Sequence, residues 1–431
     1  MTLIGSYKPR IVDSSINHIL SISGALCIEG TKYCGKTWTS TYHSNSVCAL
    51  DDPLRNYLNL RMARNDVSYA LKGELPHLID EWQLVPATWD AVRRTVDEQA
   101  LKGMYILCGS STPDDENAPL HSGFGRIFKI RMRTMSLYES SDSDGTVSLA
   151  GLFNGEIGKT PLHDVSVQQL ARLILRGGWP GNLGLNDSDT ILRVRNYPIE
   201  ICYTDLPKVD KGKNPNKMMM VLRSLSRNES TLASMSTLAK DIRENDDEPI
   251  KDTTVQDYVA TLDRMFLIEN QPAYSPNLRS SVRVGKTPKR HLTDPALAAA
   301  AMRLSESNLM DDFNTMGLFF EALCERDLQI YASAMGGKLL HYRDGRGREI
   351  DAVIELPDGR WGAFEIKMTA ERIDEAADNL LKLNEVFEMI PIVGLRSSSA
   401  YSVVRNRWHT VVRMESMWFR YAHSAPDGDI T

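Results

Sequence analysis

Eight residues near the start of the chain, Gly30 to Thr37, restrict the fold more than any other feature of the sequence. They read GTKYCGKT, follow the apolar run Ala25 to Glu29 and precede a stretch of helical character. Glycines at this spacing let backbone N–H groups turn inward around an anion, at the beginning of a helix whose dipole also favours negative charge. Strand, glycine-rich loop and helix in this order predict a parallel α/β sheet with a phosphate-binding loop.

Residues 1–150 alternate short apolar runs with amphipathic stretches, which is the pattern of a parallel sheet covered by helices. Apolar residues recur at helical spacing over 87–100, so we expect a helix there. We expect five strands, at Ala25 to Glu29, Val47 to Leu50, His77 to Ile79, Met104 to Cys108 and Ile127 to Arg131.

The residues of the loop have expected roles in holding ATP. Lys36 would reach the β and γ phosphates, and the Thr37 hydroxyl would bind Mg²⁺. After the apolar run that begins at His77, Asp80 and Glu81 would hold Mg²⁺ and polarise the attacking water, respectively. An acidic pair that only caps a helix is the alternative. The predicted nucleotide-binding residues are Gly30, Thr31, Lys32, Tyr33, Cys34, Gly35, Lys36 and Thr37.

Two further residues are candidates for the hydrolytic reaction. Ser110 follows the expected strand Met104 to Cys108, where its hydroxyl would contact the γ phosphate; an ordinary polar loop is the alternative. Arg126 follows a stretch that we interpret as helical and directly precedes the fifth strand. In a ring of subunits this position faces the neighbour's nucleotide, where a guanidinium stabilises transition-state charge. A surface or fold-stabilising arginine is the alternative.

The composition excludes several classes of protein. The 431 residues have a formal net charge of −6, so a nucleic-acid-binding surface must be confined to part of the chain. The six cysteines are scattered without CxxC pairs or zinc-site spacing, which favours a reducing compartment. No basic segment followed by an apolar core opens the chain, and no apolar run of about 18 residues occurs. We expect a cytoplasmic protein that does not span a membrane.

The composition shifts toward Lys, Arg, Ser and Met between about 207 and 300. Helices are expected at Met218 to Leu225, Ser236 to Ile242 and Thr254 to Phe266, the last capped by Asp252. The basic segment Asn277 to Lys286 that follows is interpreted as a hairpin, which together with the helices predicts a winged helix. A solvated basic face is the alternative to DNA binding. The predicted DNA-phosphate contacts are Arg279, Arg283, Lys286, Lys289 and Arg290.

A last unit begins near Ser305 and combines one long helix with a hairpin-like region. The helix runs from about Met316 to Ala334 and contains Glu321. Three runs of β character follow, at Lys338 to Tyr342, Ile350 to Leu356 and Trp361 to Ile366.

Charged residues at the ends of two of these runs form a second candidate site. Asp351 opens one run, and Glu365 and Lys367 close the next. Two carboxylates can bind Mg²⁺ and activate water for attack on a phosphodiester, with the lysine at the phosphate. If the turn is Pro357 to Gly359, Asp351 lies opposite Glu365 on one face; a two-residue turn would split the site. The pattern resembles the restriction-endonuclease-like fold, with Glu321 as its helical glutamate. A non-cleaving DNA scaffold or an ordinary surface hairpin is the alternative.

The chain as a whole resembles the bacterial and archaeal AAA+ ATPases of the AAA_14 type, which are usually joined to a DUF4143 region. The resemblance implies an AAA+ fold, Mg-ATP and a ring-shaped homo-oligomer such as a hexamer, with Arg126 as arginine finger and Arg176 as lid sensor. Besides the loop, the matching segments are Tyr7-Lys8-Pro9-Arg10, Ile79-Asp80-Glu81-Trp82-Gln83, Leu107-Cys108-Gly109-Ser110-Ser111, Gly125-Arg126, Met135-Ser136-Leu137-Tyr138-Glu139 and Gly177-Gly178-Trp179-Pro180.

These observations predict an α/β protein of four segments. They are an AAA+ P-loop parallel-sheet core at 1–152, a helical lid at 153–206, a winged-helix domain at 207–304 and an α/β restriction-endonuclease-like domain at 305–431. The leading functional hypothesis is an ATP-hydrolysing motor that acts on duplex or branched DNA and has a metal-dependent nuclease-like domain. The alternatives are a nucleotide-gated signalling ATPase and a DNA-binding regulator whose last domain only binds.

Overall fold

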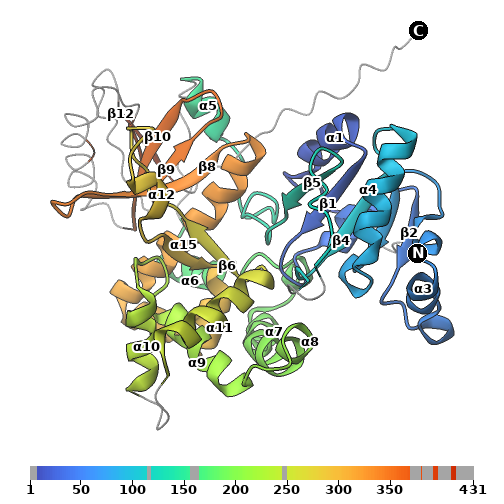
Figure 1. Ribbon diagram of the computed structural model, residues 1–431. Coiled ribbons are helices and arrows are strands. Elements are labelled where there is room, and N and C mark those ends of the chain that lie inside the picture. The colour runs from blue at the N-terminus through green and yellow to red at the C-terminus, as the bar shows by residue number, and fades with distance from the viewer. Residues whose placement is uncertain are drawn as a thin grey trace. The chain divides into compact units, whose positions relative to one another are not determined.

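The computed structural model describes residues 7–113, 118–155, 165–244, 250–368, 380, 392–396 and 409–413. The chain forms two compact units, and each unit draws on separated stretches of sequence (Figure 1). The first unit contains 1–135, 171–271 and 287–322, and the second contains 136–170, 272–286 and 323–431. The four segments expected from the sequence do not coincide with these units, and their boundaries stay predictions.

A five-stranded parallel sheet forms the centre of the first unit. The strand order is β2-β3-β4-β1-β5, and all neighbouring strands are parallel. All five expected strands are confirmed, and no strand end differs from the expectation by more than one residue. The strands are β1 (Ala25–Glu29), β2 (Ser46–Ala49), β3 (His77–Asp80), β4 (Tyr105–Gly109) and β5 (Ile127–Arg131).

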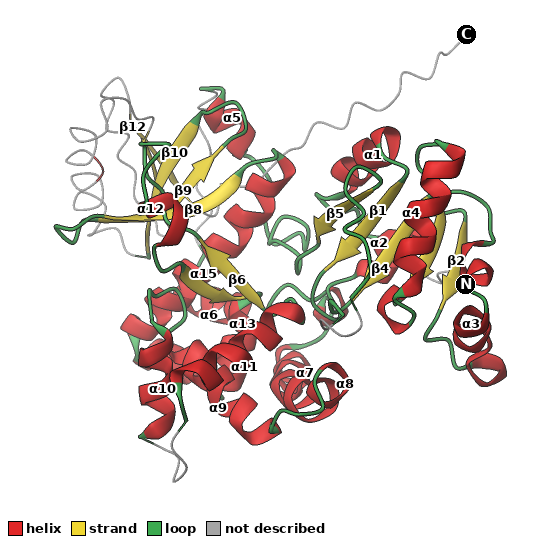
Figure 2. Ribbon diagram, in the orientation of Figure 1, coloured by secondary structure: helices red, strands yellow, loops and turns green. Residues whose placement is uncertain are grey.

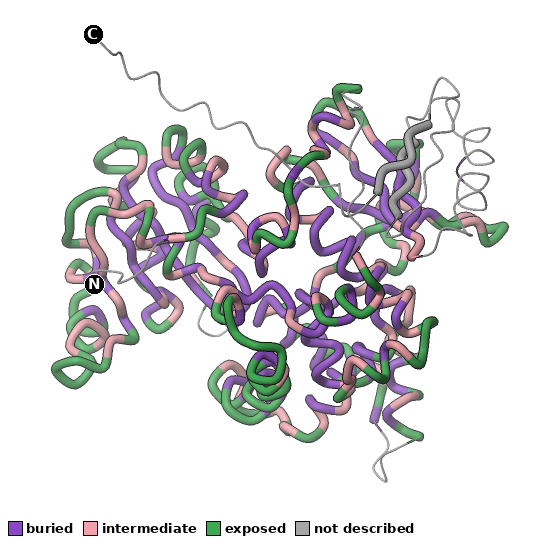
Figure 3. Tube along the Cα trace, turned by 180° about the vertical axis from the view of Figure 1, so that it is seen from behind, coloured by how far each residue is buried: buried purple, intermediate pink, exposed green. Residues whose placement is uncertain are grey.

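Helices cover this sheet on both faces (Figure 2). Leu26 and Ile28 of β1 share a core with helix α1 (Asp13–Ile22), whereas the intervening Cys27 shares another core with helix α4 (Ala87–Gln99). Successive side chains of a strand point to opposite faces, so a strand covered on both sides must be apolar throughout. Buried residues accordingly follow the strands through the interior (Figure 3).

The remaining helices of the first unit lie before, between and after the strands. Two helices, α6 (Val167–Arg176) and α15 (Phe313–Ala334), have residues in both units. No helix among the described residues is long and apolar enough to cross a bilayer. The other helical elements are α2 (Lys36–Tyr42), α3 (Leu54–Asn65), η1 (Val67–Leu71), η2 (Trp82–Leu84), η3 (Pro180–Asn182), α7 (Asp187–Ile199), η4 (Glu200–Asp205), α8 (Leu206–Val209), α9 (Pro215–Arg227), α10 (Met235–Arg243), α11 (Asp252–Arg264), α13 (Pro295–Ala301) and α14 (Glu306–Asp311).

The basic segment Asn277 to Lys286 is not a hairpin, and this expectation was wrong. It contains the short helix α12 (Val282–Gly285), and an antiparallel pair lies on either side of it in sequence, β6 (Ile268–Gln271) with β7 (Lys289–Leu292). The short polar runs IENQ and KRHL show no alternation of apolar and polar residues, which is why the sequence did not reveal these strands. Asp252 is the first residue of α11, and Lys251 occupies the N-cap position expected for it.

The second unit contains a mixed five-stranded sheet in the order β12-β11-β10-β9-β8. Strands β8, β9 and β10 are antiparallel neighbours, and β11 and β12 continue the sheet in parallel. The three expected runs are confirmed, and the last two strands were not expected. The strands are β8 (Lys338–Arg343), β9 (Glu349–Glu355), β10 (Trp361–Lys367), β11 (Ile392–Arg396) and β12 (His409–Arg413), and α5 (Leu149–Phe153) belongs to the same unit.

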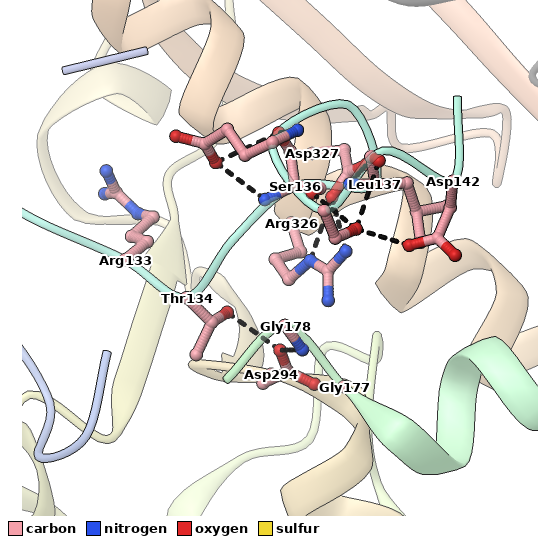
Figure 4. A network of polar contacts seen from close by, with 12 residues as sticks. Arg133, Thr134, Ser136, Leu137, Asp142, Gly177, Gly178, Asp294, Arg326 and Asp327 are labelled. Atoms are coloured by element: carbon pink, nitrogen blue, oxygen red, sulfur yellow. Dashed lines mark hydrogen bonds and ion pairs between the residues drawn. The ribbon is translucent and has the colours of Figure 1, made fainter. Parts of the chain in front are cut away.

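A buried carboxylate joins three distant segments of the first unit. Asp294 has no solvent exposure and accepts hydrogen bonds from Thr134 Oγ1 at 2.7 Å and from the Gly178 amide at 2.9 Å (Figure 4). Its other oxygen accepts from the Ala296 amide at 3.0 Å and so caps α13. Thr134 follows β5, so this one side chain connects the edge of the sheet with the Gly177–Pro180 segment and with α13.

The second unit contains a comparable junction. The amide of Leu137 donates to Asp327 Oδ2 at 3.0 Å, and Asp327 also accepts from Arg326 at 2.7 Å (Figure 4). Ser136 donates through both its amide and its hydroxyl to Glu139. Residues 136–139 are therefore held by hydrogen bonds to carboxylates, one on α15 and one within the segment itself.

The Asp294→Ala variant should be much less stable than the parent protein. Removing the carboxylate leaves buried donors without their acceptor, so we expect the free energy of unfolding to fall by about 3–5 kcal/mol. The matched control is Asp312→Ala, because Asp312 is an exposed residue that accepts from the Thr315 amide at 3.1 Å at the beginning of α15. Loss of that cap should cost about 1 kcal/mol. Urea unfolding followed by tryptophan fluorescence measures both, and equal losses would contradict the prediction.

Candidate functional site

The Gly30–Thr37 loop connects β1 to α2 and has the backbone geometry of an anion-binding nest. Tyr33 has a φ of 64° and Gly35 a φ of 104°, whereas Cys34 between them does not have a positive φ. At Gly30 a Cβ atom would lie 2.1 Å from the Met132 carbonyl oxygen, which excludes any larger residue. Glycine is thus required at position 30 because another backbone segment approaches closely, and it is favoured at position 35 because the backbone there is left-handed.

Lys36 is buried at the beginning of α2, with 5% of its surface exposed. Its Nζ donates to the Thr31 carbonyl oxygen at 2.8 Å, so the ammonium reaches back across the loop. A lysine in this position neutralises the charge of phosphates that the loop encloses. Lys36 thus lies against the backbone of the loop, and its predicted contact with the β and γ phosphates stays a prediction.

Thr37 and Asp80 present oxygen atoms to each other beside the loop. Thr37 Oγ1 donates to Asp80 Oδ1 at 3.5 Å, and Asp80 ends β3 with 4% of its surface exposed. Burial and, to a smaller extent, the charges of Glu81 and Asp51 raise the pKa of the Asp80 carboxyl to about 6, although hydrogen bonds from Cys108 and Thr37 oppose the shift. A hydroxyl and a carboxylate are the protein ligands that Mg²⁺ takes when phosphate oxygens and water complete its coordination, so this donor set fits Mg²⁺.

Glu81 and Ser110 come together at the ends of β3 and β4. Ser110 Oγ donates to Glu81 Oε2 at 3.1 Å, and the Gln83 side-chain amide donates to the same oxygen. Glu81 has a φ of 54°, a left-handed conformation that is strained for glutamate and common at functional sites. The two hydrogen bonds fix one carboxylate oxygen and leave the other to accept a proton from water.

Arg10 is a loop-supporting residue to which the sequence assigned no role. It is 6% exposed, and its two terminal nitrogens donate to the carbonyl oxygens of Cys34 and Arg133, each at 2.9 Å. The arginine thereby connects the loop to the segment after β5. The only signal in the sequence was the Tyr7-Lys8-Pro9-Arg10 motif, which matched the resembled family without indicating a contact.

Arg126 lies at the N-terminal ends of the sheet strands, whereas the phosphate-binding loop of the same chain lies at their C-terminal ends. Its carbonyl oxygen accepts from the Ala25 amide at 3.0 Å, so it sits beside the start of β1, whereas the loop follows the end of β1. A five-residue strand separates the two by about 16 Å. The guanidinium is about half exposed and pairs with Asp97 at 2.6 Å. The described residues before it, 118–126, form turns and loops and not the helical stretch that we expected.

Arg176 ends α6, and its Nε donates to the Gly177 carbonyl oxygen at 3.3 Å. This places the side chain at the Gly177–Pro180 segment. Its predicted role as a lid sensor stays a prediction.

The second candidate site forms as the three-residue turn requires. The Leu356 amide donates to the Arg360 carbonyl at 2.8 Å, and the β9–β10 register, which pairs Phe364 with Ala352, sets Asp351 opposite Glu365 at the next pair. Lys367 Nζ lies 3.1 Å from Asp351 and 2.7 Å from Glu365. The Ile366 amide also donates to Asp351 at 2.7 Å. Of the two registers that the sequence left open, the structure has the one with the three-residue turn, and the three charged side chains meet.

The charges of this cluster depend strongly on one another. Burial and the charge of Asp351 raise the pKa of the Glu365 carboxyl and Lys367 opposes both, with a net pKa of about 8. For Lys367, burial disfavours the ammonium, but the two carboxylates outweigh burial and raise its pKa. A cation between the two carboxylates stabilises both in the ionised form.

Glu321 belongs to the first unit, where it pairs with Lys289. Within the described ranges no group of three or more His, Cys, Asp or Glu side chains is arranged to hold a metal ion. A cation at Asp351 and Glu365 would thus take most of its ligands from water and substrate oxygens, which fits the coordination of Mg²⁺.

Most of the five predicted DNA contacts interact within the protein. Arg283 donates to both oxygens of Glu355, at 3.1 and 2.9 Å, and Lys286 donates to the Arg343 carbonyl. Lys289 is 7% exposed, so its burial contradicts its predicted place on a solvent-facing basic surface. Arg290 is half-buried and donates to the Ala233 carbonyl at 2.6 Å. Arg279 is exposed and stays a predicted DNA contact.

Three family models match successive parts of the chain. The model "AAA domain" (AAA_14) matches residues 23–141, which include the phosphate-binding loop, Asp80, Glu81 and Arg126. Two models described as domains of unknown function match 167–308 (DUF8612) and 316–416 (DUF4143), the latter including Asp351, Glu365 and Lys367.

The chain is also similar to proteins that have been curated or solved. Uncharacterized proteins of Mycobacterium bovis and Mycobacterium tuberculosis are each 22% identical over 365 residues, which is 84% of this chain and 74% of theirs. A Walker-type ATPase of Pyrococcus abyssi is 11% identical with a TM-score of 0.41, over 67% of this chain and 94% of that one. The family matches and the geometry of the loop show that this chain contains an AAA-like P-loop ATPase domain of the AAA_14 type, followed by a region that matches DUF4143.

Proposed function

We propose that this P-loop ATPase is a DNA-processing motor, in which ATP hydrolysis in the first unit acts on duplex or branched DNA and the second unit contains a metal-dependent phosphodiester site. The main support is the convergence of Asp351, Glu365 and Lys367, because this combination suits phosphodiester hydrolysis and is otherwise costly to bury. Mg²⁺ bound there would supply positive charge to the phosphate and lower the pKa of bound water.

In the first unit the proposed roles follow from the contacts. Lys36 neutralises phosphate charge, Thr37 and Asp80 hold the metal ion, and Glu81 takes the proton of the attacking water. The hydroxyl of Ser110, which follows β4, donates to Glu81 at 3.1 Å and so orients the Glu81 carboxylate.

Self-association into a ring is proposed from the position of Arg126. The side chain lies too far from its own loop to reach it, so it can act only on a nucleotide bound by another subunit. Exposed apolar residues lie close to it in the sequence, since Leu120 and Phe124 are each 88% exposed and Phe128 is 49% exposed. Apolar exposure along an edge strand is typical of a surface that is covered in an assembly.

Glu81→Gln should abolish ATP turnover without abolishing ATP binding. The amide cannot take a proton, so we expect kcat to fall by about 10²–10⁴-fold while the Kd for ATP stays within a few-fold. Lys36→Ala should instead weaken binding itself. The control is Glu98→Gln, an exposed acid on α4 that pairs with Arg94 at 2.8 Å. Retained turnover in Glu81→Gln would exclude the assigned base.

DNA should stimulate ATP turnover by the parent protein. The assay compares single-stranded, duplex, forked and four-way DNA at fixed ionic strength, because phosphate contacts are salt-dependent. A rise with any of these forms supports the motor. Turnover that does not respond to any of them would instead favour the nucleotide-gated signalling ATPase.

Asp351→Ala should remove Mg²⁺- or Mn²⁺-dependent DNA cleavage and leave ATP turnover intact. We expect a loss of about 100-fold or more in the cleavage rate, because one of two carboxylate ligands is lost. Asp358→Ala is the matched control, since Asp358 lies exposed in the turn of the same hairpin and accepts from Arg360 at 2.7 Å. Cleavage that persists in Asp351→Ala, or that both variants lose equally, would refute the site.

Arg126→Ala should lose turnover but bind ATP normally if the arginine acts on a neighbouring subunit. Mixing Arg126→Ala with Lys36→Ala should restore part of the activity, because some interfaces then join an intact loop to an intact arginine. Arg94→Ala, an exposed arginine on α4, is the control and should be fully active. No recovery on mixing, together with a monomeric ATP-bound chain, would exclude action in trans.

A further inference from the structure

The Gly177–Pro180 segment packs directly against the phosphate-binding loop. A Cβ atom on Gly35 would lie 3.4 Å from Pro180 Cγ, so the proline ring lies directly beside the loop at Gly35. Trp179 is 5% exposed and meets the ring of Tyr197 edge to face, with centroids 5.3 Å apart and planes at 84°. The segment thus contacts both the loop and a tyrosine of α7.

Tyr197 forms two hydrogen bonds to consecutive residues of the loop. Its hydroxyl lies 2.8 Å from Thr31 Oγ1 and donates to the Lys32 carbonyl oxygen at 3.2 Å. The side chain is 6% exposed, so water competes little for these bonds. Neither the sequence nor the family match assigned this residue a role.

The bond to Lys32 determines the direction of a neighbouring donor. In a planar trans peptide the C=O and the following N–H point in opposite directions. With the Lys32 carbonyl directed at Tyr197, the Tyr33 N–H must point away from α7. Arg10 acts on the loop in the same way, because it binds the Cys34 carbonyl at 2.9 Å and so directs the Gly35 N–H away from itself. These N–H groups belong to the left-handed residues of the nest.

Two more side chains of the same helical region contact the loop. Asp205 pairs with Lys32 at 2.5 Å, and Glu200 accepts from the Tyr33 hydroxyl at 3.1 Å. Both lie in η4, a π-helical turn that directly follows α7. Wide turns of this kind occur mostly at functional sites, because they redirect side chains that a regular helix would turn elsewhere. Residues 31–33 are therefore each contacted from one helical segment.

We propose that Tyr197, supported by Trp179, is a positioning residue that orients the backbone donors of the phosphate-binding loop. The inference rests on the proposed ATPase function and extends it, because it makes the affinity for nucleotide phosphates depend on how α7 docks against the loop. Arg10 supplies the corresponding support from the N-terminal side. The Gly177–Pro180 segment gains a role, since it holds Tyr197 in place and packs on Gly35.

The test compares Tyr197→Phe with the parent protein by calorimetric titration of ADP and of inorganic pyrophosphate. Phenylalanine keeps the ring that packs on Trp179 but loses both hydrogen bonds, so we expect each Kd to rise about three- to tenfold. The affinities for the two ligands should fall by the same factor, because the loop contacts phosphate and not the base. Thr31→Val, which removes the hydroxyl that contacts Tyr197, should also raise the Kd of both ligands.

Tyr203→Phe is the matched control. Tyr203 lies in the same helical region, is half exposed and donates to Asn216 at 2.8 Å, so its loss should leave both Kd values unchanged. Unchanged affinities in Tyr197→Phe, or a loss for ADP without one for pyrophosphate, would overturn the proposal. ATP turnover by the parent protein, measured separately, tests the ATPase function itself, so failure of one proposal is distinguishable from failure of the other.

Discussion

The nucleotide site depends on carbonyl groups of the phosphate-binding loop that are bound by side chains distant in sequence. Arg10 binds one such carbonyl from the N-terminal side, and Tyr197 binds another from α7. Because Arg10 also binds the Arg133 carbonyl, the loop, the edge of the sheet and the N-terminal segment form one continuous set of contacts. An eight-residue motif therefore functions only when much of the first unit has folded around it.

The charges that surround the buried carboxylates differ between the two candidate sites. At Asp80, burial together with Glu81 and Asp51 raises the pKa, whereas hydrogen bonds from Cys108 and Thr37 lower it, and no cationic side chain is among the causes of the shift; a bound cation would favour the ionised form further. At Glu365, burial and Asp351 likewise raise the pKa, but Lys367 supplies a positive charge from the protein itself. The second site thus holds its acids together without a metal ion. A cation entering it would compete with an ammonium that is already 2.7 Å from Glu365.

The sequence predicted what depends on local patterns. The strands of the first sheet were recognisable because burial on both faces requires continuous apolar runs, and the Pro357–Gly359 turn allowed the correct register at Asp351. Contacts between distant residues that belong to no recognisable motif could not be predicted. Lys289 looked like one member of an exposed basic cluster, although Glu321, 32 residues away, pairs with it in the interior. Tyr197 lies in a helix whose sequence shows no sign that it meets a loop 165 residues earlier.

The turn between β9 and β10 limits how this hairpin can change in evolution. Hairpin loops ordinarily tolerate insertions and deletions, because they are exposed and pack against little. Here one residue more or less would turn Glu365 and Lys367 to the face of the sheet opposite Asp351, and the strands themselves would still pair. A related chain with a turn of another length could keep the architecture of the second unit and yet lack its charged cluster. The length of this turn is thus a simple marker for which relatives retain the site.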